Sequence, residues 1–537
     1  MPRARTRQNQ QLMNGINSSK SESVRSLVRN RLIALLLLVC AVALLLPIWS
    51  VRFPPLLDYP NHLASSFVLA HLHNPAYNFA RAYAGEWGLK PYIATDFLMG
   101  ALGRILPPLA AGKIVLSLGA LGLPLAAWFF LRQVNPGEDA IAFWFLLAGH
   151  NIFFRYGFVG FYCSLAILFL TLALWLRFLK QPSAGRWICA CLALTTTYFT
   201  HIMGFGFAVL IIGIYSLTRP KIREWLLSAA LFVPGFACYF LSSRVVEKQQ
   251  GGAGMRSFAD KLDAFWLILH SNSHRLDEIS LACVVALFFF GWLLNLEFRL
   301  QWRWVIVAAG VLAAFIAMPV SYGDGYDIDI RALPVFFVTL FATVRLGRRG
   351  WALAPLALLI FGARTYNVTN YFHSVQPEMA GLAGSFQMTP PNVRVLPIVT
   401  GPDEDPIRQY YAHFWAYGTI DRGWISPYLF EDPGLLPLDV ILDTYTLDGF
   451  WDLSYNETVH WDRIRADYDY VYAYDAPDFE EDLRKIGQIV YTSGKLKLFR
   501  MIKQAPQLPA APEAAKKSIN RHHPLNIARP THGNAAR

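Results

Sequence analysis

The feature that most constrains this chain is a succession of apolar blocks, each about as long as a membrane is thick. Roughly twenty apolar residues in a helix cross the ~30 Å hydrocarbon core of a bilayer. The composition agrees, because 54% of the 537 residues are hydrophobic and 16% are charged, against about 25% charged in soluble domains. We therefore predict an α-helical polytopic membrane protein.

The net charge of +11 is distributed as a topology signal. Lysine and arginine gather in the N-terminal tail and in short loops between apolar blocks. That is the pattern of the positive-inside rule and differs from a basic face that neutralises phosphates. We therefore expect no nucleic-acid partner and a cytoplasmic N-terminus.

The segment Tyr92–Leu106 decides the number of spans. It carries Asp96 and Arg104 and is short for a span, so crossing would be costly. We interpret it, with Pro60–His73, as a juxtamembrane helix on the outer surface. The basic loops then share one side, which predicts about eleven transmembrane helices and an outer C-terminus. The predicted spans are 32–49, 113–132, 140–154, 161–179, 187–201, 203–217, 225–242, 280–295, 304–320, 332–344 and 351–365.

The chain divides into four predicted parts. A basic cytoplasmic tail (1–31) precedes the transmembrane domain (32–365), whose first outer loop covers 50–112. From about residue 366, strand-like runs alternate with charged and proline-rich segments, which predicts a soluble α/β domain (366–505) outside the membrane. The Pro/Ala/Lys-rich end (506–537) has few core-forming residues and is predicted to be disordered.

Asp58 is the acidic residue whose position suggests chemistry. It follows Pro54-Pro55, which ends the preceding helix, and Pro60 stands where a new helix can begin. One interpretation is that Asp58 caps this helix. The other is that Asp58 and His62 present a carboxylate and an imidazole to a substrate at the membrane surface.

Other polar residues fall on the same predicted outer face as Asp58. Ionisable groups at membrane depth are costly and often mark a site, although snorkelling or helix capping explains some of them equally well. A carboxylate can take a proton from a hydroxyl, and arginine binds phosphate through paired hydrogen bonds. The candidate donor-phosphate or substrate-binding residues are His62, Arg155, His201, Asp329 and Arg331, with His150, Asn151, His270, His274, Asp324 and Asp327 on the same face.

The chain resembles the bacterial GT-C glycosyltransferases in layout. In that superfamily an acidic residue follows the first span and juxtamembrane helices come next, and Asp58 occupies that position. The segments that carry the resemblance are Leu57-Asp58-Tyr59-Pro60-Asn61-His62-Leu63, Lys90-Pro91-Tyr92, Pro107 to Arg132, Arg155-Tyr156-Gly157-Phe158, Thr200-His201-Ile202-Met203-Gly204-Phe205 and Asp329-Ile330-Arg331-Ala332-Leu333-Pro334.

The resemblance implies an inverting enzyme of the bacterial inner membrane. It would move a sugar from a polyprenyl-phosphate-linked donor to a lipid or polysaccharide acceptor on the outer face, with Asp58 as the catalytic residue. Many members have two neighbouring acids that are often tied to a divalent cation, Mg or Mn. This chain has Asp58 alone, with Glu86 and Asp96 the next acids, so the resemblance leaves the metal open.

Two other functions remain at this stage. The missing second acid favours a non-catalytic GT-C-like scaffold for cell-envelope glycan assembly, in which the C-terminal domain would do the work. A transporter is the third alternative. The sequence argues against it, because no chain of charged residues runs through the span centres and no pair of Gly/Pro-broken repeats is present.

Overall fold

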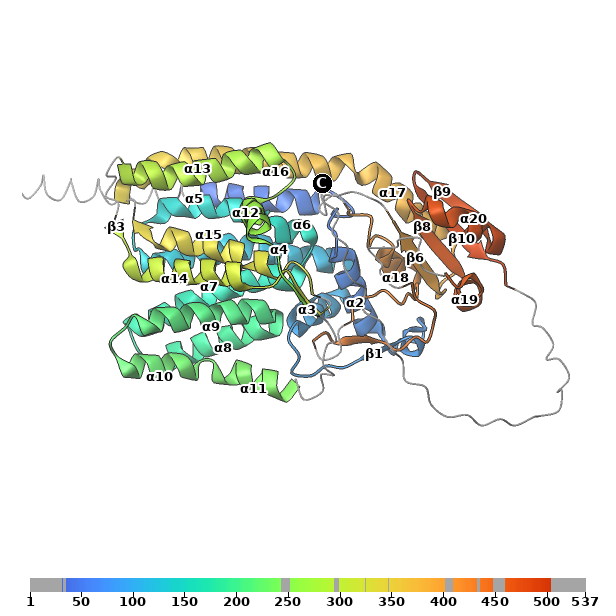
Figure 1. Cartoon of the computed structure of the whole chain (residues 1–537), viewed down its shortest axis with the longest axis horizontal. Coiled ribbons are helices and arrows are strands. Elements are labelled where there is room, and N and C mark those ends of the chain that lie inside the picture. Colours follow the sequence, from blue (N-terminus) through green and yellow to red (C-terminus); the bar gives the residue numbers. More distant parts are fainter. Residues whose placement is uncertain are drawn as a thin grey trace, which may run out of the picture.

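The computed structural model describes residues 31, 35–242, 252–293, 299–323, 325–345, 347–400, 409–431, 435–447 and 459–503. These residues form a long helical bundle that meets a sheet-containing unit at one end (Figure 1). Nearly all of the predicted tail 1–31, the predicted tail 506–537 and Asp324 lie outside the described residues.

The bundle consists of helices that match most of the predicted spans. Three helical stretches among the described residues are long and apolar enough to cross a membrane: Pro108–Val134, Val159–Lys180 and Ile222–Ser242. The count of eleven spans stays a prediction. The bundle helices are Leu35–Trp49, α4 (Pro108–Val134), α7 (Val159–Lys180), α8 (Ala184–Thr200), α9 (Ile202–Leu217), α10 (Ile222–Ala230), α11 (Val233–Ser242), α13 (His274–Leu293), α14 (Trp302–Ala317), α15 (Ala332–Ala342) and α16 (Ala354–Ser374).

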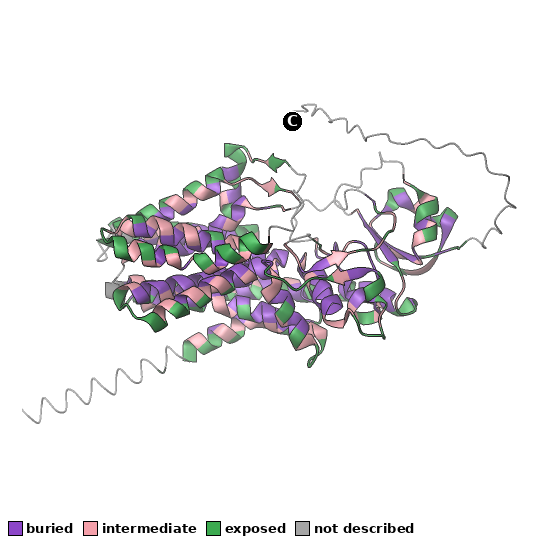
Figure 2. Ribbon diagram, turned by 90° about the horizontal axis from the view of Figure 1, so that it is seen from below, coloured by how far each residue is buried: buried purple, intermediate pink, exposed green. Residues whose placement is uncertain are grey.

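Small residues let α4 and α7 pack closely in the centre of the bundle. A Cβ atom at Gly119 of α4 would lie 2.5 Å from the Tyr162 ring of α7, and one at Gly122 would lie 2.9 Å from Ala166. Small residues on one face of a membrane helix permit such approach. Buried residues accordingly run along the middle of the bundle, whereas its outer helix faces are exposed and apolar (Figure 2).

The predicted third span, 140–154, is not one helix. It is divided into η2 (Asp139–Ile141), α5 (Ala142–Phe145), η3 (Leu146–Ala148) and α6 (Ile152–Tyr156). Asn151 starts α6 by accepting hydrogen bonds from the backbone N–H groups of Phe153 (2.9 Å) and Phe154 (3.1 Å). Apolar composition alone does not reveal this break, because the segment 140–154 is buried throughout.

The two predicted juxtamembrane helices form as α2 (Tyr59–His71) and α3 (Ile93–Gly103). Most side chains of α2 are buried within the protein, so α2 is not a helix with one face open to its surroundings, and its position relative to the membrane stays a prediction. It packs between α3, α4 and α18 (Ala416–Arg422), a helix from the C-terminal part of the chain. In addition, β1 (Tyr83–Gly85), which follows η1 (Phe79–Arg81), pairs with β7 (Leu438–Val440).

The C-terminal unit contains a four-stranded sheet in the order β6-β8-β10-β9. β6 (Val395–Val399) runs parallel to β8 (Tyr470–Tyr474), and the pairs of β10 (Leu496–Met501) with β8 and with β9 (Gly487–Ser493) are antiparallel. The helices beside it are α17 (Gln376–Gly384), η8 (Ser385–Met388), α19 (Trp461–Asp467) and α20 (Pro477–Ile486).

Both faces of this sheet are covered, by different parts of the chain. Successive side chains of a strand point to opposite faces. In β8, Val471 and Ala473 pack with α19 and α20, whereas Tyr470, Tyr472 and Tyr474 join the large core that includes the bundle. Helix α16 also continues through the predicted boundary at 365/366. The sheet is therefore packed onto the bundle, and the division at 366 stays a prediction.

Short elements close the two ends of the bundle. Near the C-terminal unit lie β2 (Ala253–Gly254), which pairs with β4 (Ser321–Tyr322), α12 (Phe258–Phe265), η5 (Trp266–Leu269) and η6 (Asp329–Arg331). At the opposite end, β3 (Arg299–Leu300) pairs with β5 (Val344–Arg345), followed by η7 (Gly347–Leu353).

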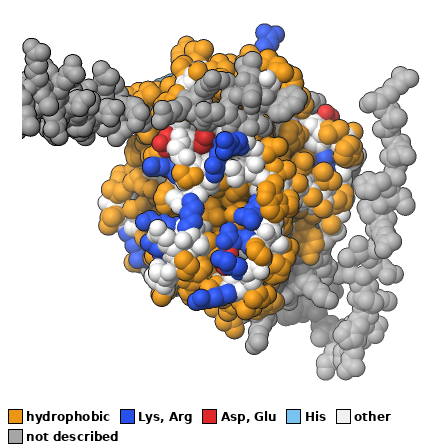
Figure 3. Space-filling model, turned by 90° about the vertical axis from the view of Figure 1, so that its left-hand side faces the viewer, with side chains coloured by type: hydrophobic (Ala, Val, Ile, Leu, Met, Phe, Trp, Pro, Cys, Tyr) orange, Lys and Arg blue, Asp and Glu red, His pale blue; other side chains and the backbone are white. Residues whose placement is uncertain are grey.

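That opposite end is basic (Figure 3). Exposed lysines and arginines stand at the ends of α4, α7 and α10 and on β3: Arg132, Arg177, Lys180, Lys221, Arg223 and Arg299. The two ends of the bundle are thus distinct, one covered with positive charge and the other by the C-terminal unit.

Candidate active site

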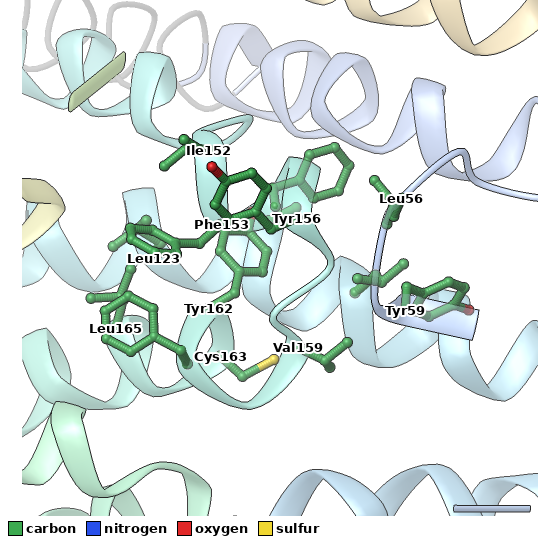
Figure 4. Packing of buried hydrophobic residues seen from close by; sticks show 14 of the residues in the cluster. Leu56, Tyr59, Leu123, Ile152, Phe153, Tyr156, Val159, Tyr162, Cys163 and Leu165 are labelled. Atoms are coloured by element: carbon green, nitrogen blue, oxygen red, sulfur yellow. The ribbon is translucent and has the colours of Figure 1, made fainter. Parts of the chain in front are cut away.

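Asp58 stands at the start of α2, in a turn held against α6. The backbone N–H of Asp58 donates to the carbonyl of Tyr156 (2.8 Å). Gly157 permits this contact: its φ is +73°, and a Cβ there would lie 2.6 Å from the backbone nitrogen of Tyr59. Figure 4 shows Leu56 and Tyr59 beside the segment from Tyr156 to Val159. The Asp58 side chain makes no capping hydrogen bond to α2, so its carboxylate is available for other contacts.

The carboxylate of Asp58 meets His413, which sequence reasoning missed. His413 Nε2 lies 3.4 Å from Asp58 Oδ1, and the His413 side chain is 4% exposed. His413 belongs to the segment 409–431, which follows a stretch outside the described residues. Nothing near it in the sequence marks it, since His413 stands among aromatic residues that suggest core packing. Only the fold reveals the pair.

Asn61, one helical turn from Asp58, ties α2 to the same segment. Its Oδ1 accepts from the backbone N–H of Phe430 (2.8 Å), and its Nδ2 donates to the carbonyl of Tyr428 (2.8 Å). The same Nδ2 lies 3.3 Å from His413 Nδ1. The ring of Phe430 stands edge-on to both His413 and His62, with centroids 5.0 Å apart in each pair.

Arg331 and His201 come together from distant parts of the chain. Arg331 Nη1 lies 3.1 Å from His201 Nε2, and Arg331 Nη2 donates to the carbonyl of Tyr326 (3.1 Å). His201 occupies the junction of α8 and α9, where its Nδ1 accepts from the backbone N–H of Met203 (3.0 Å). Tyr92 stands edge-on to the imidazole at 4.3 Å. The predicted grouping of His201 with Arg331 is therefore present in the fold.

Electrostatics link this pair to Asp58. Burial raises the pKa of Asp58 to about 8; the positive charge of Arg331 lowers it, and the negative charge of Asp327 raises it. Burial also lowers the pKa of His62 to about 4. Asp58, His62, His201 and Arg331 therefore share one partly desolvated environment, in which a carboxyl proton is exchangeable near neutral pH.

Asp327 and Asp329 have different surroundings although they are two residues apart. Asp329 is fully buried and forms ion pairs with Arg256 and Lys261, each at 3.2 Å. Asp327 also pairs with Arg256 (2.5 Å), but its charge acts on Asp58. Asp329 therefore belongs to an ion-pair cluster that joins α12 to η6, whereas the charge of Asp327 also acts on Asp58.

Arg155 lies beneath the Asp58 turn. It is fully buried, donates to the carbonyl of Pro55 (3.2 Å), and stands over the rings of Tyr371 and Phe372. The structure therefore gives Arg155 a contact that holds the turn in place.

The remaining polar residues of the predicted outer face have local contacts. His150 Nε2 lies 2.9 Å from the Leu44 carbonyl, and Asn151 caps α6. His270 pairs with Asp277 (3.2 Å), and His274 is exposed beside Glu278.

Side chains that could ligate a metal ion are dispersed among the described residues. In the part of the chain that the structure describes, no three His, Cys, Asp or Glu side chains come together as metal ligands.

Comparison with known proteins supports the fold. No protein-family model matches the chain, and no curated protein matches it in sequence. Among solved structures, it is similar to the crystal structure of ArnT from Cupriavidus metallidurans bound to undecaprenyl phosphate, with 12% sequence identity and a TM-score of 0.50. The likeness covers 88% of this chain and 99% of the ArnT chain. The chain therefore has a fold similar to that of the ArnT structure.

Proposed function

We propose that this protein is a membrane glycosyltransferase that moves a sugar from a polyprenyl-phosphate-linked donor to a lipid or polysaccharide acceptor. One observation carries the proposal: two hydrogen-bond donors, Arg331 and His201, face each other within an environment shared with the Asp58 carboxyl. The likeness to ArnT, whose structure contains undecaprenyl phosphate, supports the class of donor.

The geometry of His201 favours an anionic ligand. A neutral imidazole carries one proton, and its other nitrogen accepts. Since Nδ1 accepts from Met203 N–H, the proton resides on Nε2, which then faces the donor-only guanidinium of Arg331. A phosphate oxygen would accept hydrogen bonds from both groups. We infer that the donor phosphate binds here, with His62 next to it.

Asp58 supplies the acid–base chemistry in this proposal. The ionised carboxylate takes the proton of the acceptor hydroxyl as that oxygen attacks the anomeric carbon of the sugar. The bond between that carbon and the phosphate oxygen breaks, and the leaving polyprenyl phosphate keeps the electron pair. Arg331 balances the charge that develops on this phosphate. Attack on the side opposite the leaving group inverts the anomeric centre.

The basic end of the bundle sets the proposed topology. Positive residues favour the cytoplasmic side, so the end that carries Lys180 and Arg299 faces the cytoplasm. The site and the C-terminal unit (366–505) then lie outside the inner membrane of a bacterium, with eleven spans between the two surfaces. There, a polyprenyl donor reaches the site while its tail stays in the bilayer.

The test uses the full chain purified in nanodiscs. Undecaprenyl-phosphate-linked hexoses and pentoses, each labelled in the sugar, are incubated with protein and with membrane glycolipid as acceptor. We expect label to appear in the acceptor with the wild type and not with Asp58→Asn, while the surface variant Asp263→Asn, at an exposed position of α12, stays active.

Two further measurements, together with the transfer assay, distinguish the alternative functions. Binding of undecaprenyl phosphate alone, measured as a rise in melting temperature, is expected for the wild type and weakened in Arg331→Gln. Transfer that is unchanged in Asp58→Asn would overturn the assignment of Asp58. Cells whose surface glycan is unchanged by Asp58→Asn but lost on deletion of 366–505 would support a scaffold instead.

A further inference from the structure

The orientation of the Asn61 amide is fixed by two backbone groups, and this has chemical consequences for its neighbour. The N–H of Phe430 can only donate and the carbonyl of Tyr428 can only accept, so the atoms that face them must be Oδ1 and Nδ2 of Asn61 respectively. Asn61 is fully buried, so water does not offer a substitute partner. The second hydrogen of Nδ2 points to His413.

This amide in turn fixes the tautomer of His413. Nδ2 of Asn61 is a donor, so His413 Nδ1, 3.3 Å away, must accept. A neutral imidazole that accepts at Nδ1 carries its proton on Nε2. Nε2 is the nitrogen that lies 3.4 Å from Asp58 Oδ1. The pair does not meet hydrogen-bond geometry in this conformation, and catalytic hydrogen bonds are often long or poorly aligned before substrate binds.

His413 is held in its neutral form. Burial, together with a smaller contribution from His62, lowers the pKa of His413 to about 3. The charged groups that act on Asp58 are Arg331 and Asp327 from the other side of the site. His413 therefore meets Asp58 as a neutral N–H donor at neutral pH.

We propose that His413 is a positioning residue for Asp58: Asn61 sets its tautomer, and its Nε2–H holds the carboxylate in the orientation that receives the acceptor proton. This inference rests on the proposed function of Asp58. His413 is not assigned as a proton relay, because its Nδ1 faces the Nδ2 donor of Asn61. The segment 409–431 thereby completes the active site, since neither Asn61 nor His413 has its contacts without it.

The first test reads the tautomer and needs no activity. The full chain is labelled with ¹⁵N-histidine in nanodiscs, and His413 is assigned among the 13 histidines by its loss in His413→Gln. We expect a neutral Nε2–H imidazole from pH 5 to 9. In Asn61→Asp the acceptor-only carboxylate should move the proton to Nδ1. A charged His413 at pH 6, or an Nδ1–H tautomer in the wild type, would overturn the inference.

The second test reads the reaction. His413→Phe removes the donor, so the Asp58 carboxylate loses stabilisation and the acid limb of kcat/KM should shift upward by about one pH unit, with a roughly tenfold fall at pH 7 and a smaller one at pH 9. His413→Gln keeps an N–H donor and should recover part of the loss, and His460→Gln, an exposed histidine of the same unit, serves as control.

The outcomes separate the two proposals. An equal fall at every pH in both His413 variants indicates a structural role and overturns the positioning role, while sugar transfer by the wild type still stands. Absence of transfer by the wild type contradicts the proposed function, and the ¹⁵N spectra still decide the tautomer. If His413→Gln fails to fold, the His413 signal is assigned as the histidine signal that shifts in the Asn61→Asp spectrum.

Discussion

Asp58 and Asp277 have similar neighbours, but their pKa values are shifted in opposite directions. Each lies against a histidine and near an arginine. Asp277 is 4% exposed and is bonded on every side, by Arg364 (2.5 Å), by His270 (3.2 Å) and by Ser271 through its N–H (2.9 Å) and hydroxyl (2.7 Å).

The pKa values of the two groups follow from these contacts. Burial raises the pKa of Asp277, but the hydrogen bond of His270, the charge of Arg364 and the bonds of Ser271 outweigh it, so that the pKa lies below the ordinary value. At Asp58, burial dominates and the pKa rises to about 8. A carboxylate that accepts several hydrogen bonds and pairs with a cation, such as Asp277, stays ionised and does not exchange its proton near neutral pH. A desolvated carboxylate without a direct cationic partner, such as Asp58, has a pKa near neutral pH and can exchange a proton there.

Asp58→Asn should give the largest effect. An amide cannot take the acceptor proton, so the rate of sugar transfer should fall roughly 10²–10⁴-fold while the variant inserts and folds normally. Transfer of labelled sugar at saturating donor measures this. A fall of less than threefold would place the chemistry elsewhere and remove the contrast with Asp277.

Asp277→Asn should act on stability and spare the chemistry. It leaves the Arg364 guanidinium buried without its counter-ion, which costs about 3–5 kcal/mol in comparable pairs. We expect a lower melting temperature in detergent and less folded protein, with unchanged kcat per folded molecule. A lowered kcat in the folded fraction would show that Asp277 shares in catalysis after all.

The two charges that act on Asp58 should shift the pH profile in opposite directions. Asp58 works when ionised, so activity rises as pH passes its pKa. Asp327→Asn removes a negative charge, lowers that pKa and moves the acid limb of kcat/KM to lower pH. Arg331→Gln removes a positive charge and moves the limb to higher pH. Shifts of the same sign in both variants would contradict the electrostatic link.

The last prediction is a pH-dependent stability change at Asp58 itself. Its folded pKa of about 8 exceeds the ordinary 3.8, so the folded state binds more protons between these values and stability falls as pH rises through that window. Asn does not titrate. The melting temperature of Asp58→Asn should therefore exceed that of the wild type by an amount that grows from pH 5 to pH 8. A difference that is constant with pH would contradict the raised pKa.

Sequence reasoning succeeded where a local pattern carries the information. Apolar blocks of span length located α4, α7 and α9, and the prolines around Asp58 located the start of α2. The grouping of His201 with Arg331 was also predicted, because both stand at the same predicted ends of their helices.

Sequence reasoning did not predict the contacts of side chains whose partners lie far away in the chain. Asp329 is as acidic in sequence as Asp58, and only the fold brings Arg256 and Lys261 to neutralise it. The hydrogen bond of Arg155 to the carbonyl of Pro55 was not predicted, while its predicted role in binding substrate stays a prediction. His413 carries no local signal at all, because its partner Asn61 is 352 residues away.

Because 352 residues separate Asn61 from His413, the two residues are synthesised at different times. Ribosomes add about 5–20 residues per second, so Asn61 emerges roughly 20–70 s before His413. Through that interval the bundle inserts helix by helix while α2 lacks Phe430 and Tyr428, its two backbone anchors from the C-terminal part. A half-made chain thus contains Asp58 but not its partner, and a premature stop before residue 413 yields a membrane-embedded product that lacks the assembled site.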